Sequence, residues 1–221
     1  MAIALVSGQT AVGGSFTTTL NVAFPSDNTA GSLLVYAAGG IGNNPTITDS
    51  NNTPVQLVSE FFNGDTLSEI HYVQNCSAGA NTVSHTTGGE IERSMIISEY
   101  SGAATTGVAD GSSSSSGYSN SPASGTVATT EAGEMYWGTA SSGYSPITWS
   151  ESTGFTLTAE GGDARPIHAQ HRIGPSHPTT DESDQGMNTG ANWACCVGLF
   201  KEAAGGGGGT ILPQMLHHHG G

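Results

Sequence analysis

Basic residues are scarce in this chain. Lys and Arg together number 4 against 18 Asp and Glu, so the formal net charge is −14 over 221 residues. The four are Arg93, Arg165, Arg172 and Lys201, which are too few to form a basic surface against phosphates. The sequence therefore predicts no binding to nucleic acid and no electrostatic attachment to anionic membranes. Solubility is the plain explanation of the acidity.

Long apolar runs are also missing. No segment has the length that a membrane-spanning helix requires. The start, Met1–Ser7, has no basic residue and a short apolar run, which is not the pattern of a secretory signal. We therefore expect a protein that is made in the cytoplasm without a signal peptide.

Cysteine is rare and odd in number. Cys76, Cys195 and Cys196 do not suggest a disulfide framework. Side chains of adjacent residues on a strand point to opposite faces, so Cys195 and Cys196 are expected to separate. We interpret all three as small, reduced core residues.

Glycine, serine and threonine are abundant, and short apolar segments alternate with turns. Phe16–Phe24 alternates apolar and polar residues, the pattern of a half-buried strand. Leu33–Ala38 is a continuous apolar run, which suits a strand covered on both faces. Ser94–Tyr100 is too apolar and β-branched for an exposed edge and is predicted to be a central strand. In 167–173 one face carries Ile167, Ala169 and His171, and the other His168. We predict an all-β fold over residues 1–204, an antiparallel β-sandwich with jelly-roll connections.

Some segments are harder to place. Ala103–Ser124 is rich in serine and lacks periodicity, which predicts a long surface loop. Thr46–Asp49 and Val55–Val58 are expected to form a hairpin across an Asn-rich turn. Trp137 and Trp193 lie in apolar strands and are predicted to fill the core between the sheets.

The end of the chain differs in character. Residues 205–209 are five glycines, typical of a flexible tether. A short apolar segment and three histidines follow, so residues 205–221 are predicted to be a docking tail that binds a partner by strand addition. An unstructured terminus or a sequence left by cloning is the alternative. The partner-docking candidates are Ile211, Leu212, Met215 and Leu216.

The order of several short segments along the chain is also informative. They are, in sequence, Ala30–Val35, Thr46–Ser50, Ala78–Val83, Ile97–Gly102, Ser124–Val127, Thr148–Trp149, Gly154–Leu157 and Asn192–Lys201. Together they resemble a sandwich domain of phage particle proteins and bacterial surface proteins. The resemblance covers nearly the whole chain and implies a β-sandwich in a capsid cement, decoration or fibre protein. It carries no catalytic signature, so it implies the fold more directly than the function.

The sequence shows no recognisable catalytic set. Gly143–Pro146 lacks the final glycine and the helix of a nucleophile elbow. His168 and His171 would lie on opposite faces of one strand and cannot share a metal. Asp181, Glu182 and Asp184 offer oxygen ligands for calcium but match no known calcium loop, and this alternative stays open. We predict no enzyme activity, no cofactor and no resident metal.

Aromatic residues near turns suggest a different kind of site. Sugar-binding sandwiches stack exposed aromatic rings on sugars, and Tyr118, Tyr136, Tyr144 and Trp149 are candidates for such a platform. Tyr144 and Trp149 are the foremost, because Gly143 and Pro146 place them beside turns.

Two functions follow. The first is a non-enzymatic structural protein of a phage particle, which decorates or cements the capsid through contacts with other virion proteins, as a homo-oligomer. The alternative is a carbohydrate-binding or host-recognition module on a fibre or cell surface.

Overall fold

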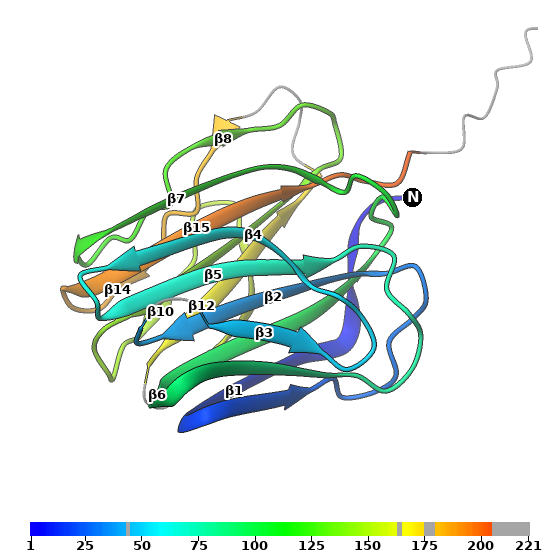
Figure 1. Cartoon of the computed structure of the whole chain (residues 1–221). Helices are drawn as coiled ribbons and strands as arrows, with labels where there is room; N and C mark the ends of the chain where they lie inside the picture. The colour runs from blue at the N-terminus through cyan, green and yellow to red at the C-terminus, as the bar shows by residue number, and fades with distance from the viewer. Residues whose placement is uncertain (43–44, 163–164, 175–179, 205–221) are drawn as a thin grey trace, which may run out of the picture.

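The computed structural model describes residues 1–42, 45–162, 165–174 and 180–204. Across these ranges the chain forms strands and turns without any helix, and hence without a helix long and apolar enough to cross a membrane. Two antiparallel sheets pack face to face (Figure 1), which confirms the predicted all-β sandwich. The jelly-roll connections stay a prediction, and the tail at 205–221 lies outside the described residues.

The first sheet has the strand order β1-β6-β2-β5-β4, with β3 also paired to β6. Since β3 pairs with β6 and β4 pairs with β5, the predicted hairpin between β3 and β4 is wrong. The Asn-rich turn connects two strands that each find a different partner. The strands are β1 (Ala4–Ala23), β2 (Leu33–Gly40), β3 (Thr46–Asp49), β4 (Val55–Phe62), β5 (Thr66–Val73) and β6 (Thr82–Ser101).

The second sheet has the order β11-β12-β9-β15-β7. Two short pairs lie outside it, β10 with β14 and β8 with β13. The five strands are β7 (Ala109–Ser119), β9 (Met135–Ser142), β11 (Thr156–Gly161), β12 (Ile167–Ile173) and β15 (Ala191–Phe200). The short ones are β8 (Val127–Ala128), β10 (Trp149–Ser150), β13 (Thr180–Asp181) and β14 (Gly186–Met187).

Strand β7 corrects the prediction of a long loop at 103–124. Its backbone pairs with β15 along nearly its whole length, from Ala109 to Ser119. The hydroxyls of Ser114 and Ser116 donate to the carboxylate of Glu60 in β4, at 2.9 and 2.8 Å. Serine side chains therefore connect the two sheets here. A strand rich in serine lacks the alternation of apolar and polar residues from which a strand is predicted.

The core between the sheets contains side chains from both of them. Leu33, Val35 and Ile96 come from the first sheet, and Trp137 and Cys196 from the second. The indole nitrogen of Trp137 donates to the Tyr100 hydroxyl at 2.9 Å, so its one polar atom is satisfied. The prediction for Trp137 is thus confirmed.

The outer faces of both sheets are also covered. Strand β1 folds back on itself and brings Val22 against Gly13. The contact is so close that a methyl group added at Gly13 would lie 2.5 Å from the Cγ2 of Val22. Leu20 and Val22 thereby pack with Leu34 and Tyr36 on the face of β2 that points away from the second sheet. Both faces of β2 are consequently buried, as its continuous apolar run predicts.

On the second sheet, loops and the β10–β14 pair form the cover. Trp193 packs there with Ala140, Met187 and Cys195, so it is buried but outside the core in which it was predicted to lie. Strand β15 alternates its side chains, and Trp193 falls on the outward face with Cys195, opposite Cys196. All three cysteines are free and buried, and the predicted separation of Cys195 and Cys196 is confirmed.

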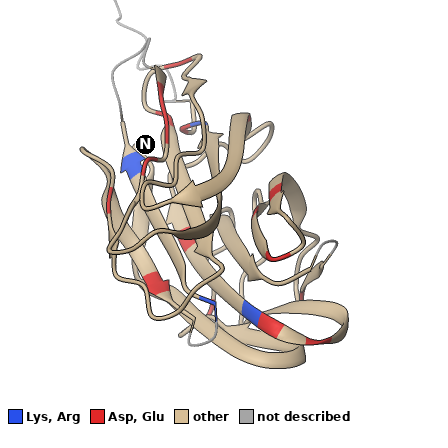
Figure 2. Ribbon diagram, turned by 90° about the vertical axis from the view of Figure 1, so that its left-hand side faces the viewer, with Lys and Arg blue, Asp and Glu red and all other residues tan. Residues whose placement is uncertain are grey.

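Charge is sparse but used structurally. Figure 2 shows acidic positions spread along strands and loops, with few basic ones among them. Arg165, just before β12, donates its Nε to Glu92 at 2.7 Å and its Nη2 to Asp65 at 3.0 Å. Glu92 belongs to β6 and Asp65 to the β4–β5 turn, so this guanidinium ties the second sheet to the first.

Candidate functional site

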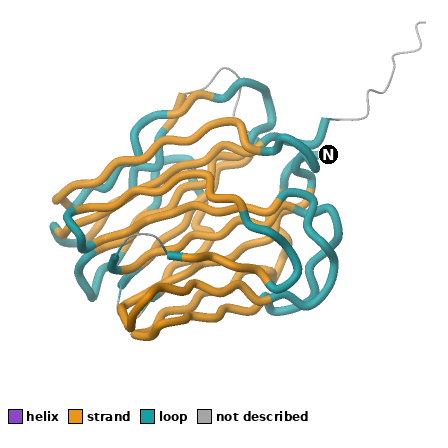
Figure 3. The backbone as a smooth tube through the Cα atoms, in the orientation of Figure 1, coloured by secondary structure: helices purple, strands orange, loops and turns teal. Residues whose placement is uncertain are grey.

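The segment 143–149 links β9 to β10. Figure 3 shows the strands running through the body of the molecule and the loops that connect them. Both foremost candidates for sugar stacking, Tyr144 and Trp149, belong to the segment 143–149. Ile147 and Trp149 are partly buried against the outer apolar cluster of the second sheet, which anchors the segment. Trp149 opens β10 and pairs with Met187 of β14.

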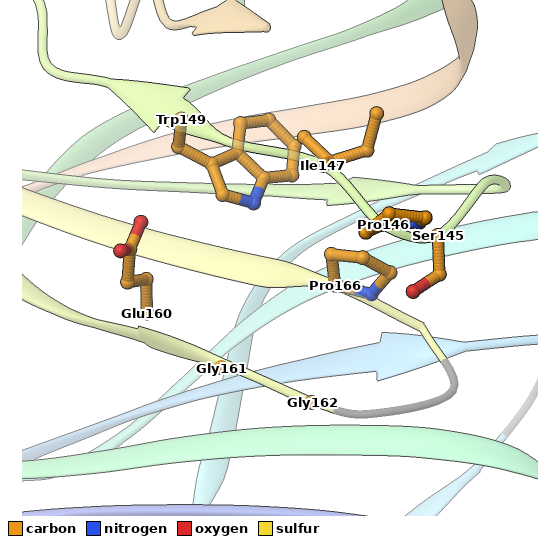
Figure 4. Close-up of a pocket in the computed structure, with 8 residues that line it drawn as sticks. All are labelled: Ser145, Pro146, Ile147, Trp149, Glu160, Gly161, Gly162 and Pro166. Carbon is orange, nitrogen blue, oxygen red and sulfur yellow. The ribbon is translucent and has the colours of Figure 1, made fainter. Parts of the chain in front are cut away.

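Trp149 lines a hollow of about 330 Å³. In Figure 4 the nitrogen-bearing edge of its indole is turned toward the side on which Glu160 and Pro166 lie. Glu160 is exposed in β11 and is the one ionisable side chain among the described residues that line the hollow. The residues around the hollow are Ser145, Pro146, Ile147, Trp149, Glu160, Gly161, Gly162 and Pro166.

The indole nitrogen of Trp149 is buried and has no hydrogen-bond partner among the described residues. A buried donor without an acceptor is unfavourable, by about 1–3 kcal/mol. Of the polar groups at the hollow, the exposed Glu160 carboxylate is the one that a ligand hydroxyl can reach, and it accepts the hydrogen bond.

Behind the indole lies His168, which is fully buried. The two rings have centroids 5.7 Å apart and are inclined by 30°. Burial lowers the pKa of His168 from its ordinary value, so the imidazole is neutral near pH 7. Its Nδ1 is 2.8 Å from the amide oxygen of Gln185, which can only accept, so Nδ1 carries the proton. The imidazole thus forms a fixed support for Trp149.

Tyr144 lines a second hollow, of about 370 Å³. Tyr118, at the end of β7, lines the same hollow. Tyr118 is 71% exposed and Tyr144 is 54% exposed. Asn192 completes the polar part, with its Nδ2 donating to Asp65 at 2.9 Å. The remaining lining residues are Gly143, Thr189, Gly190 and Ala191.

The structure thus places Tyr144 and Trp149 on two hollows that share one connecting segment. Tyr118 and Tyr144 line one of these hollows, and Trp149 lines the other. Tyr136 lines neither of them, because it is buried under the outer loops with its hydroxyl donating to the Val127 carbonyl at 3.1 Å. Tyr136 lies on the outward face of β9, but loops cover that face and bury the side chain.

The other candidates are not brought together. His168 and His171 point to opposite faces of β12 as predicted, and His171 lies 3.3 Å from the Tyr100 hydroxyl in the core. Asp181 forms an ion pair with Arg172. Within the described ranges no group of three or more His, Cys, Asp or Glu side chains could hold a metal ion. Ile211, Leu212, Met215 and Leu216 lie outside those ranges.

Sequence reasoning did not identify Glu160 and Asn192 as site residues. Glu160 lies in β11, the next strand along the chain after the one that contains Trp149, and Asn192 lies 48 positions beyond Tyr144. Neither carries a local motif, and only the sheet order brings each beside its aromatic partner.

Comparison with known proteins gives no further guide, since the chain matches no protein-family description, no curated protein and no solved structure.

Proposed function

We propose that this protein is a non-enzymatic β-sandwich that binds carbohydrate through the two hollows beside residues 143–149. The phage particle is the setting that its sequence resemblance implies. The observation that carries the proposal is the half-buried Trp149, which lines one hollow together with the exposed Glu160. A sugar ring offers an apolar face for the indole and hydroxyls that can donate to the carboxylate.

The second hollow supports the same ligand class. Tyr118 and Tyr144 are both more than half exposed, and Asn192 lines the hollow with them. Both hollows are lined by residues of the segment 143–149, so an oligosaccharide could place one sugar unit in each. Aromatic anchors of this kind dominate binding energies in many interfaces, while their surroundings contribute less.

Glycan-array screening followed by calorimetry tests the proposal. Trp149→Ala is expected to weaken binding at least about tenfold, which corresponds to about 1.4 kcal/mol. Glu160→Gln should weaken it less, because the amide keeps an acceptor. Val55→Ala, an exposed apolar residue of β4 (49%), is the matched control and should bind as the wild type does. Retention of full affinity by Trp149→Ala would refute the site.

Fluorescence supplies an independent readout. Trp137 and Trp193 are buried (0% and 7% exposed), so Trp149 is the tryptophan that contacts added ligand. A glycan that binds in its hollow should shift the emission and protect Trp149 from acrylamide quenching. Binding without a change in emission would indicate that the glycan binds at the Tyr144 hollow instead.

Capsid cementing is the second candidate, and one observation favours it. The outer edge of β1 is unpaired in the described structure and its 20 residues include no charged side chain. Such an edge is suited to strand pairing with a neighbouring subunit. A particle assembled with and without the protein would differ in its resistance to heat or low salt if cementing is the role.

A further inference from the structure

The edge strands of this sandwich are not alike. Natural proteins protect exposed edges from pairing with charged residues, prolines or short strands. Four of the edge strands carry an acidic residue: Asp49 in β3, Glu60 in β4, Asp110 in β7 and Glu160 in β11. Strand β1 has neither charge nor proline in 20 residues, although the whole chain carries −14.

The middle of β1 is a regular strand. From Thr10 to Thr17 it pairs with β6 without a register shift, and irregularities occur on both sides of this stretch. Val12 and Phe16 point to the same face of the strand, four residues apart, and are 38% and 63% exposed. Strand β11 comes near β1 where Gly161 meets Val12, but no ladder joins the two strands.

We propose that Thr10–Thr17 pairs with the same stretch of a second copy, antiparallel across a two-fold axis. A second β1 is the occupant that the charges favour, because it brings no charged side chain to an edge that has none. An isologous contact requires a self-complementary surface, and an antiparallel strand pair provides one. The inference deepens the cementing role and is independent of the carbohydrate site.

The sequence also selects a register. When Gly14 lies opposite Gly14 on the axis, Val12 of each copy stands opposite Phe16 of the other. Aromatic residues opposite β-branched ones are favourable cross-strand pairs, about 0.2–1 kcal/mol each. The two exposed apolar side chains of each copy thereby cover one another, and the two first sheets become one continuous sheet.

Light scattering after size-exclusion chromatography tests this on the full chain. The wild type is expected to be a dimer at tens of micromolar, and Phe16→Glu a monomer, because two carboxylates would then meet the apolar edge. Val55→Glu, which adds the same charge to β4, should remain a dimer. A monomeric wild type, a dimeric Phe16→Glu or a monomeric Val55→Glu would each overturn the proposal.

Two further measurements identify the surface directly. In hydrogen exchange, amides within 10–17 should gain protection as the wild-type concentration rises, and Phe16→Glu should show no such gain. Circular dichroism checks that the variant is folded. Loss of the dimer on removal of residues 205–221 would assign the contact to the tail instead. Sugar binding by the Phe16→Glu variant should be unchanged, so failure of either proposal is visible separately.

Discussion

Replacement of Arg165 by Gln should measure how strongly one cation joins the two sheets. Arg165 is 10% exposed, while its partners Asp65 and Glu92 are each 34% exposed. Loss of one partner from a fully buried pair destabilises by about 3–5 kcal/mol, and from an exposed pair by about 0–1 kcal/mol. With one buried partner and two carboxylates one-third exposed, we expect a loss of about 2 kcal/mol.

Urea denaturation followed by fluorescence gives the free energy of unfolding of each variant. The loss should shrink when Arg165→Gln is made in a Glu92→Gln background, because residues in direct contact are energetically coupled. It should also shrink at 1 M salt, where the Debye length falls to about 3 Å. A loss below about 0.5 kcal/mol, or strict additivity with Glu92→Gln, would show that the apolar core alone holds the sheets together.

Three further outcomes can be measured in the same way. Burial and the neighbouring Asp110 raise the pKa of Glu134 from 4.5 to about 7, so the folded state retains a proton that the unfolded chain has lost. Stability should therefore fall as pH rises from about 4.5 to 7, and Glu134→Gln should remove this slope in urea titrations across that range. Trp137→Phe should lower stability by about 2 kcal/mol, since it shortens a buried ring and removes the hydrogen bond to Tyr100; an unchanged midpoint would contradict this. Because burial raises the pKa of Cys76 to about 11 and encloses the other two thiols, a thiol reagent should label no cysteine in the native protein and all three in urea.

The strands that the sequence predicted correctly have side-chain patterns set by burial. In β12, Ile167 and Ala169 face the core while His168 and Gln170 face outward, as the alternation indicates. The segment Ser94–Tyr100, which forms the second half of β6, was correctly placed between two neighbouring strands. In these cases the distribution of apolar residues is itself the cause of the structure, so it can be recognised without the fold.

Other features depend on partners far along the chain. Strand β7 is specified by its ladder to β15 and by Glu60, 54 residues before Ser114. The burial of Trp193 on the outward face depends on the loops that cover the second sheet. The site follows the same rule: Trp149 and Tyr144 stand beside turn residues and were recognised, whereas Glu160 and Asn192 are defined only by the strand order. Local pattern predicts the aromatic half of the site, and topology supplies the polar half.

The burial of β2 and β9 on both faces has a consequence for how the protein can vary. All eight residues in each strand are buried, so no position on either has a side chain free to change. In a scan of all substitutions, exposed positions of β4 and β11, such as Val55 and Glu160, should tolerate change, while β2 and β9 should be uniformly intolerant. New binding specificities can therefore arise only at the loops and edges around this fixed centre, where residues 143–149 and the outer side of β1 lie.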